Sequence, residues 1–170
     1  GYFPANADGD DLVIWSDESR RREKTRFSFP RQRRDPWLCI ADFFRPVSSD
    51  DVDVAAFHIV TMGGRVSERT AELFEGDEYQ EYLLLHGLGV EMAEALAEYW
   101  HKRIRQQLGI AQDDALEIQG LFQQKYQGSR YSFGYPACPN LQDQEQILRL
   151  LDGDRIGVSL TEDWQLVPEQ

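Results

Sequence analysis

The hydrophobic pattern of the chain changes its period near residue 63. On the N-terminal side, residues 10–15 form a β-branched and aromatic run, residues 25–29 alternate polar with apolar positions, and residues 55–62 form an apolar run that ends at Gly63-Gly64. Short β-branched runs and alternation with a period of two are typical of strands. We therefore expect three strands here, the first two of which can pair as an antiparallel hairpin.

From residue 67 to residue 107, apolar side chains recur with the spacing of a helix. Gly87 and Gly89 lie near the middle of this stretch. Because glycine weakens a helix interior, we expect a bend or break there that separates two helices. The second helix carries apolar positions three and four residues apart, which predict a stripe that faces the core: Leu85, Leu88, Met92, Leu96 and Tyr99.

The C-terminal third of the chain adds shorter elements. Residues 114–124 and 142–151 suit short helices, and residues 156–160 suit a strand. Strands early, helices in the middle and a strand late indicate an α+β fold, with an antiparallel sheet packed with helices and a long central helical region. We expect one domain over residues 1–170. Because the chain opens without a methionine and stops in an apparent approach to another strand, we expect a fragment that is incomplete at both ends.

Composition excludes several classes of protein. Apolar residues make up 41% of the chain, and no apolar run nears the about 20 residues that span a membrane, so we expect a globular protein without a membrane partner. The formal net charge of −12 disfavours a nucleic-acid partner, because cations that neutralise phosphates supply most of that affinity. Cys39 and Cys138 leave a single disulfide open, but we expect a reducing, cytoplasmic setting.

One segment runs against this acidic balance. Within fifteen residues it holds eight cations and only Glu23 as an opposing charge. Two interpretations stay open: a solvated face of a hairpin, or a docking surface for an acidic partner. The eight cations are Arg20, Arg21, Arg22, Lys24, Arg26, Arg31, Arg33 and Arg34.

Most catalytic and metal-binding constellations are absent from the sequence. There is no Gly-x-Gly-x-x-Gly fingerprint, no P-loop and no Gly-x-Ser-x-Gly nucleophile elbow. Glu98 and His101 have the Glu-x-x-His spacing of helical metal ligands, but di-iron bundles need two such pairs and two further glutamates. We therefore expect no metal site, and we expect His58, inside an apolar run, to be a core histidine.

Residues 130–139 form a segment rich in glycine, proline and aromatic residues, which excludes a regular helix or strand. Its rings can fill the core under a turn, or the loop can bind a ligand. In the second case Arg130 offers a planar fork for a carboxylate, and the rings can stack on a purine or face a cation. Gly134 permits close backbone approach, and Glu94 or Glu98 can neutralise an amino group.

The same segment, Arg-Tyr-Ser-Phe-Gly-Tyr-Pro-Ala-Cys-Pro, resembles the Arg-x-x-x-Gly-Tyr-Pro-Ala-Cys-Pro signature of the reactivation domain of cobalamin-dependent methionine synthase. Three further segments resemble that family in the same order. Residues 1–11 contain its Phe-Pro-Ala-Asn and Gly-Asp-Asp motifs, residues 38–44 its Cys-Leu-Ala-Asp-Phe-like strand, and residues 93–101 its Ala-Glu-Ala-x-Ala-Glu-x-x-His helix.

The resemblance implies a twisted antiparallel sheet with helices and a role in methionine biosynthesis. The family enzyme moves a methyl group from methyltetrahydrofolate to homocysteine through cobalamin, whose cobalt is occasionally oxidised to an inactive state. The domain then binds S-adenosylmethionine, and a flavodoxin-like reductant supplies an electron. By the same resemblance, cobalamin belongs to another domain of the same chain, which is a partner of this one, and zinc only to other domains.

The resemblance also implies which residues bind the ligand. Arg130 matches the arginine that contacts the methionine carboxylate, Glu94 matches a glutamate by the amino group, and Ser132, Gly134 and Tyr135 line the ligand. No catalytic side chain is implied, because cobalt is the nucleophile. An acidic contact upstream and a tyrosine downstream in the family are missing from this sequence. The alternative function is an interaction module that docks the reductant and the cobalamin domain without binding ligand.

Overall fold

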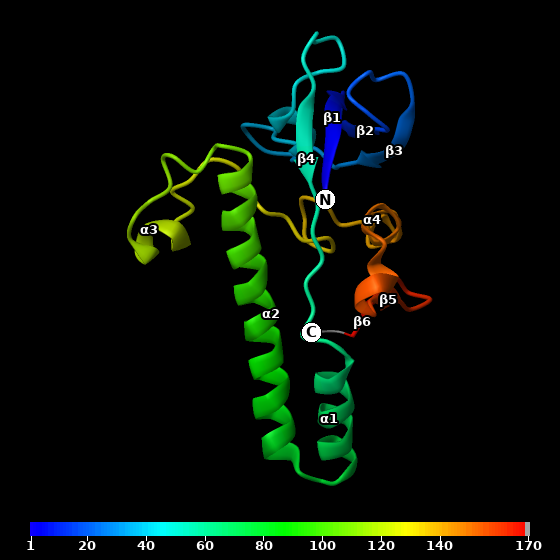
Figure 1. Ribbon diagram of the computed structural model, residues 1–170, viewed down its shortest axis with the longest axis vertical. Coiled ribbons are helices and arrows are strands. Elements are labelled where there is room, and N and C mark those ends of the chain that lie inside the picture. The colour runs from blue at the N-terminus through cyan, green and yellow to red at the C-terminus, as the bar shows by residue number, and fades with distance from the viewer. Residues whose placement is uncertain (169–170) are drawn as a thin grey trace. The chain divides into compact units, whose positions relative to one another are not determined.

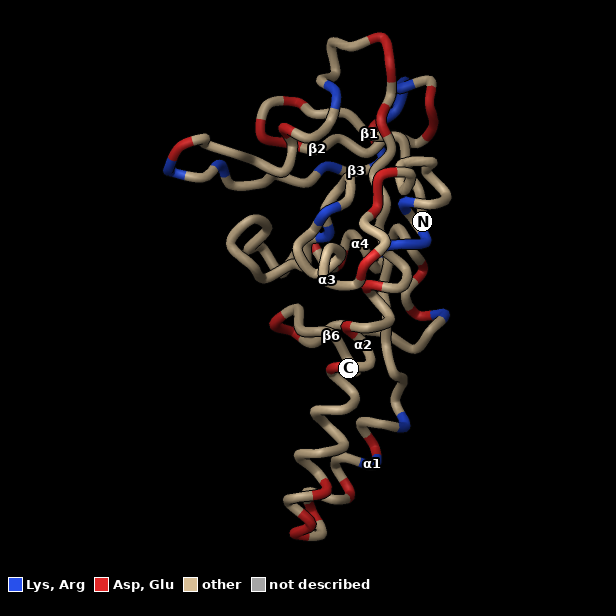
Figure 2. Tube along the Cα trace, turned by 90° about the vertical axis from the view of Figure 1, so that its left-hand side faces the viewer, with Lys and Arg blue, Asp and Glu red and all other residues tan. Residues whose placement is uncertain are grey.

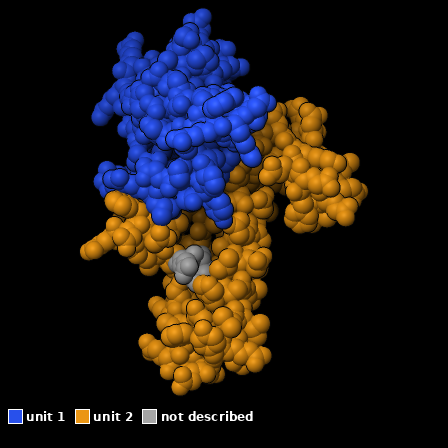
Figure 3. Space-filling view, turned by 180° about the vertical axis from the view of Figure 1, so that it is seen from behind, with its two compact units in different colours: residues 1–57, 131–151 blue, residues 58–130, 152–170 orange. Residues whose placement is uncertain are grey.

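The computed structural model describes residues 1–168, which divide into two compact units (Figure 3). Unit 1 comprises Gly1–Phe57 and Tyr131–Leu151, and unit 2 comprises His58–Arg130 and the C-terminal segment from Asp152. Each unit is thus built from two separate stretches of sequence. The expectation of one domain over the whole chain stays a prediction.

The core of unit 1 is an antiparallel sheet with the strand order β3-β2-β1-β4 (Figure 1). Its strands are β1 (Tyr2–Asp8), β2 (Asp11–Trp15), β3 (Glu23–Ser28) and β4 (Asp53–Ala56). A two-residue turn joins β1 to β2, and Gly9 in that turn has φ +64, the left-handed region that hairpin turns require. The α+β class and the antiparallel sheet are confirmed.

Strand β1 is a central element of the sheet that the sequence did not predict. Its residues include Pro4 and two alanines, which have little intrinsic preference for strands. It is nevertheless an interior strand, paired with β2 on one side and with β4 on the other. Ala5 is fully buried between these neighbours, so tertiary pairing rather than local propensity forms the strand.

The strand predicted over residues 55–62 is wrong beyond Ala56. In the sheet, Ala56 pairs with Tyr2, close to the first residue of the chain. Two further bonds follow, from the N–H of Phe57 to the carbonyl of Gly1 and from the amino group of Gly1 to the carbonyl of Phe57. Strand β4 therefore ends opposite Tyr2, the residue at which its antiparallel partner β1 begins. The apolar residues that follow Phe57 belong to unit 2.

Two helical elements complete unit 1: the short 3₁₀ helix η1 (Ile40–Phe43) and the helix α4 (Asp143–Leu151). The side chain of Asp42 accepts a hydrogen bond from the Cys39 N–H at 2.8 Å, which caps η1. Gln146 of α4 is hydrogen-bonded to Thr25 of β3, so this helix is tied to the sheet. The predicted helix over residues 142–151 is confirmed.

An aromatic cluster fills the core of unit 1 beside the sheet. The ring of Phe27 is fully buried and has its centroid 5.3 Å from that of Phe57, 6.1 Å from Phe133 and 6.4 Å from Phe29. Aromatic pairs at these separations contribute about 0.5–1.5 kcal/mol beyond the area they bury. The cluster fixes Phe133, and with it the loop that carries the predicted site, to the sheet.

Unit 2 is dominated by an antiparallel helical hairpin of α1 (Gly64–Glu75) and α2 (Tyr79–Gln107) (Figure 1). The chain reverses at Gly76 and at Asp77, whose φ is +58, so the predicted break at Gly87 and Gly89 is wrong. Helix α2 continues through both glycines, because a glycine costs a helix only about 1 kcal/mol and packing offsets it. The tip of the hairpin is acidic (Figure 2).

The predicted core stripe of the second helix is wrong at three positions. Leu88, Met92 and Tyr99 are exposed. The buried residues of α2 lie on a different face, and they share spacings of four and eight residues: Gly89, Ala97, His101 and Arg105. A small residue lets the backbone pack closely, whereas polar residues need partners when buried. Neither kind of residue contributes to a hydrophobic stripe in a sequence.

The remaining elements of unit 2 are short. They are α3 (Ile118–Phe122), the 3₁₀ helix η2 (Gly153–Ile156) and the two-stranded pair β5 (Ser159–Leu160) and β6 (Leu166–Val167). The predicted helix over residues 114–124 is confirmed in shortened form. The strand predicted over residues 156–160 is confirmed only at its last two positions. Within residues 1–168, no helix has the length and apolar character to cross a membrane.

Candidate ligand-binding site

Arg130 is held by two carboxylates that project from one face of α2. Its Nε and Nη2 both donate to Oε1 of Glu98, at 3.3 and 2.8 Å, and Nη2 also donates to Oε2 of Glu94 at 3.0 Å. Glu94 and Glu98 are four residues apart, one helical turn, which places both carboxylates beside the same guanidinium. The arrangement brings together two residues predicted to bind ligand, Arg130 and Glu94, and adds Glu98.

The charges of this cluster are unequal in number and in exposure. The Arg130 side chain is 20% exposed, whereas those of Glu94 and Glu98 are 61% and 54% exposed. Burial disfavours the charged form of Arg130, but hydrogen bonds to Glu98 and Glu94 outweigh it, so the pKa of Arg130 is raised. One cation beside two carboxylates leaves a surplus negative charge. The cluster therefore complements a zwitterion, with a cation for its carboxylate and a carboxylate for its ammonium group.

The loop that follows Arg130 forms a tight turn within unit 1. Gly134 donates its N–H to the carbonyl of Cys138, and Cys138 donates to the carbonyl of Tyr135, both at 2.9 Å. The Cys138 thiol lies 3.0 Å from the carbonyl oxygen of Ser132. Gly134 has φ +95, and a Cβ at this position would lie 3.0 Å from Leu141 Cδ2. Both the backbone angle and the close neighbour favour glycine here.

The aromatic residues of this loop divide between two roles. Phe133 packs against Phe27 and belongs to the core. Tyr131 and Tyr135 are exposed, and Tyr135 is 67% exposed. The interpretation that the rings of this loop fill the core therefore holds for Phe133. The two tyrosines stay available for contact with a ligand or a partner.

The five predicted site residues thus fall into two groups. Arg130 and Glu94 meet in unit 2, and Ser132, Gly134 and Tyr135 share one turn in unit 1. By its chemistry Glu98 is an alternative to Glu94 as a partner for an amino group, but the resemblance to the family implies a ligand contact only for Glu94. Its signal in the sequence is the four-residue spacing between the two glutamates.

Further along α2, two polar residues are buried one turn apart. His101 contacts the ring of Tyr126 edge-on, with centroids 5.3 Å apart, and its Nδ1 has no hydrogen-bond partner within residues 1–168. Burial, and then the charge of Arg105, lower the pKa of His101 to about 4. In the described part of the chain, no group of three or more His, Cys, Asp or Glu side chains is arranged to hold a metal ion.

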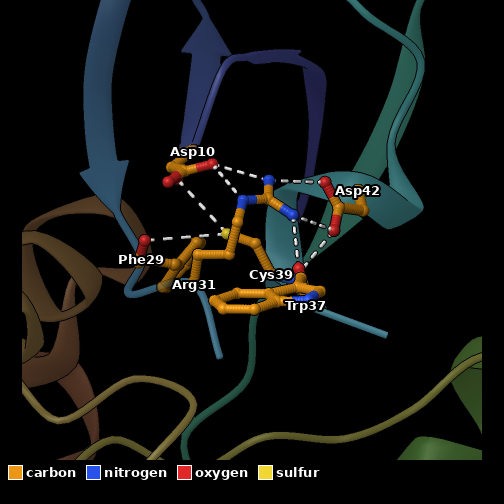
Figure 4. Close-up of polar contacts among 6 residues, drawn as sticks. All are labelled: Asp10, Phe29, Arg31, Trp37, Cys39 and Asp42. Carbon is orange, nitrogen blue, oxygen red and sulfur yellow. Dashed lines mark hydrogen bonds and ion pairs between the residues drawn. The ribbon is translucent and has the colours of Figure 1, made fainter. Parts of the chain in front are cut away.

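Part of the basic run is neutralised within unit 1. The Arg31 guanidinium lies between Asp10 and Asp42, at 2.6 and 2.7 Å, and also donates to the Trp37 carbonyl (Figure 4). Its hydrogen bonds lower the pKa of Asp42 to about 2. Another member of the run, Arg26, forms ion pairs with three carboxylates, those of Asp8, Asp11 and Glu23.

The rest of the run differs. Arg20 donates to two backbone carbonyls, those of Val47 and Ser49, and Lys24 lies 5.2 Å from the centroid of the Phe3 ring. Four arginines are exposed and have no ion pair with any residue of the described range: Arg21, Arg22, Arg33 and Arg34. Four of the eight cations in the basic run are thus exposed side chains without an ion pair in the part of the chain that the structure describes.

Comparison with known proteins identifies the family. The family described as "Vitamin B12 dependent methionine synthase, activation domain" matches residues 1–170. The chain belongs to this family. Methionine synthases of Mycobacterium leprae and Mycobacterium tuberculosis are 43% and 44% identical to it over 181 aligned positions. These matches cover 100% of the chain but only 15% of each relative, so the activation-domain chain spans a small part of those enzymes.

A solved structure of the same family has the same fold. The crystal structure of the MetH reactivation domain bound to AdoHcy aligns with a TM-score of 0.87 and 31% sequence identity. The alignment covers 99% of the activation-domain chain and 54% of the MetH chain. The sequence-based recognition of this family is confirmed.

Proposed function

We propose that this chain is part of a cobalamin-dependent methionine synthase and binds S-adenosylmethionine for the reductive methylation that reactivates cob(II)alamin. The observation that carries the proposal is the cluster of Arg130 with Glu94 and Glu98, which pairs a partly buried cation with surplus negative charge. Such a cluster suits the amino-acid part of the ligand. The AdoHcy bound by the related MetH domain has the same part.

The residues of this chain bind and orient the ligand in the proposal. The guanidinium of Arg130 binds the α-carboxylate, and a charge-assisted bond of this kind contributes about 1.5–3 kcal/mol. Glu94 accepts from the α-ammonium group. The turn that contains Ser132, Gly134 and Tyr135 supplies further contacts. Its backbone is held by the bonds of Cys138 to the N–H of Gly134 and to the carbonyl of Tyr135.

No side chain of this domain has to move a proton or form a covalent bond. When bound, S-adenosylmethionine supplies a methyl group to cob(I)alamin, which another domain of the full enzyme holds. The contribution of this chain is then positioning, which lowers a barrier by fixing two reacting centres in a productive geometry. We further propose a cytoplasmic setting and the cobalamin-binding domain of the same protein as a partner. Zinc, where the full enzyme uses it, belongs to other domains.

Calorimetric titration of the complete activation domain with S-adenosylmethionine tests the proposal. We expect the wild-type domain to bind and the Arg130→Ala variant to lose at least tenfold in affinity, since about 1.5–3 kcal/mol is removed. Arg33→Ala serves as the matched control, because it also removes an arginine but from an exposed site without an ion pair. Circular dichroism checks that each variant is folded. Equal binding by the wild type and Arg130→Ala would contradict the proposed site.

A second candidate function is docking of an acidic, flavodoxin-like reductant. It is favoured by the four exposed arginines of the basic run, which carry no internal ion pair, in a chain of net charge −12. Charge reversal at Arg21, Arg22 and Arg33 should weaken reductant binding, and the loss should shrink as salt rises. Reversal of Arg26, which is already paired with three carboxylates, provides the contrast. Unchanged binding at low salt would exclude this surface.

A further inference from the structure

The two carboxylates that hold Arg130 occupy different edges of its guanidinium. Glu98 Oε1 accepts from both Nε and Nη2, so it takes the side edge of the group. Glu94 Oε2 accepts only from Nη2, and the second N–H of Nη2 faces the end edge shared with Nη1. Within residues 1–168, Nη1 itself makes no hydrogen bond. Both donors of the side edge, Nε and Nη2, are therefore engaged, whereas only Nη2 of the two donors at the end edge makes a hydrogen bond to a described residue.

We propose that Glu98 is a positioning residue that holds the side edge of Arg130, so that the ligand's carboxylate takes the end edge and displaces Glu94. The inference rests on the function proposed above and deepens it by assigning separate tasks to the two glutamates. Glu98 stays in place when ligand binds. Glu94 exchanges the guanidinium for the ligand's ammonium group.

The contacts decide which carboxylate gives way. Glu98 makes two bonds to Arg130, the shorter of them 2.8 Å, whereas Glu94 makes one bond of 3.0 Å. Glu94 is also the more exposed of the two, at 61% against 54%, so its carboxylate leaves the guanidinium at the smaller cost. A ligand carboxylate at the end edge gains the unused Nη1 donor as well as the Nη2 donor that Glu94 releases. That is the bidentate geometry in which arginine binds carboxylates most strongly.

Without Glu98, the guanidinium of Arg130 keeps a single anchoring bond. Arginine has several rotatable bonds, so fixing its side chain in one conformation costs conformational entropy. In the wild type, that cost is met before the ligand arrives. The role of Glu98 is therefore preorganisation, and it acts on ligands only through Arg130.

The test compares two ligands on the complete activation domain by titration calorimetry. S-Adenosylhomocysteine carries the amino-acid group, and 5′-deoxy-5′-methylthioadenosine has the same nucleoside and thioether without it. We expect Glu98→Gln to weaken S-adenosylhomocysteine about tenfold and to leave methylthioadenosine unchanged, because a neutral amide holds the guanidinium less firmly. Glu98→Asp, which keeps the charge, should recover part of the loss.

Three results would overturn the inference. Tighter binding of S-adenosylhomocysteine by Glu98→Gln would show that Glu98 competes with the ligand for the side edge. Unchanged binding would show that Glu98 has no role. An equal loss for both ligands would show a general structural effect. Arg130→Ala separates these results from the proposed function. If Arg130→Ala binds S-adenosylhomocysteine normally, the proposed site itself is wrong. If Arg130→Ala loses binding while Glu98→Gln binds normally, only the positioning role of Glu98 is rejected.

Discussion

Arg105 and Asp114 form an ion pair that is withdrawn from solvent at both ends, with 2.7 Å between Nη2 and Oδ2 and side chains only 4% and 8% exposed. The guanidinium carbon also lies 4.0 Å from the centroid of the Tyr126 ring. Asp114 follows α2 and Tyr126 follows α3, so one arginine at the end of the long helix fastens the segment that leads to Arg130. The position of the candidate site in unit 2 depends on this contact.

Removing one member of this pair should destabilise the domain strongly. In Asp114→Ala, Arg105 stays buried without a counter-charge, and breaking a buried pair in this way costs about 3–5 kcal/mol. Urea unfolding of the wild type and the variant measures the difference. The double variant Arg105→Met with Asp114→Leu should recover much of the loss, since it removes both charges. A loss under about 1 kcal/mol in Asp114→Ala would contradict the burial of the pair.

The stability of the domain should depend on pH through His101. Burial and the charge of Arg105 lower its pKa to about 4 in the folded state, against about 6.5 in an unfolded chain. Below pH 6.5 the unfolded state therefore binds a proton that the folded state excludes. The contribution of His101 to stability should be constant above that pH, and it should lower the stability as the pH drops towards 4, by up to about 3 kcal/mol.

Urea unfolding between pH 4.5 and 7.5 measures this dependence. The variant His101→Phe cannot titrate, so the part of the slope between pH 4 and 6.5 that belongs to His101 should vanish. Equal slopes in the wild type and His101→Phe would show that His101 does not lower stability in acid.

The sequence predicted the elements whose signal is local. A β-branched run predicted β2, the alternation of polar and apolar residues predicted β3, and amphipathic spacing predicted α4. Strand β1 has no such signal, because its alanines and Pro4 fit a sheet only when β2 and β4 lie on both sides. The boundary between α1 and α2 was misplaced for a related reason. Gly87 and Gly89 look like helix breakers, but a small residue such as Gly89 can also serve close packing.

The candidate site was predicted in part. The family motif and the chemistry of arginine pointed to Arg130 and Glu94, which the structure brings together. Glu98 supplies the second carboxylate that binds the guanidinium. It lies on an exposed face of α2, and no hydrophobic pattern in the sequence identifies that face. The buried face of α2 was missed because His101 and Arg105 are polar, and only their partners Tyr126 and Asp114, on a separate segment, make their burial favourable.

Asn6 should be the most sensitive polar residue of the sheet. Its side chain is fully buried, and its amide nitrogen lies 3.1–3.5 Å from three backbone carbonyls, those of Arg45, Pro46 and Asp51. Its oxygen accepts from the indole N–H of Trp15 at 2.9 Å. In Asn6→Ala these groups lose their partner inside the protein, and each buried unpaired group costs about 1–3 kcal/mol. We expect a loss of about 2–4 kcal/mol in urea unfolding.

Asn140→Ala is the matched control for Asn6, because Asn140 is exposed and bonds mainly to its local neighbour Asp143. Its loss should stay within about 1 kcal/mol. Trp15 fluorescence gives a second measurement, since the indole loses its acceptor only in the Asn6 variant. Equal losses in the two variants would contradict the role assigned to Asn6.

Gly134→Ala should strain the turn that carries three of the predicted ligand-binding residues. An alanine at φ +95 adopts a backbone conformation that L residues rarely occupy, and its Cβ would meet Leu141 Cδ2 at 3.0 Å. The two effects together should destabilise unit 1 by about 1–3 kcal/mol. Gly9→Ala isolates the backbone part: Gly9 also has positive φ, at +64, but has no atom within 4 Å of an added Cβ. Urea unfolding should therefore show the larger loss for Gly134→Ala.

The steric part of that loss can be separated further. In a Leu141→Ala background the side chain that an added Cβ would meet is absent, so Gly134→Ala should then cost about as much as Gly9→Ala. The difference between the two backgrounds measures the coupling of Gly134 to Leu141. If Gly134→Ala costs the same in both backgrounds, the close contact contributes nothing, and glycine is required at this turn by its backbone angle alone.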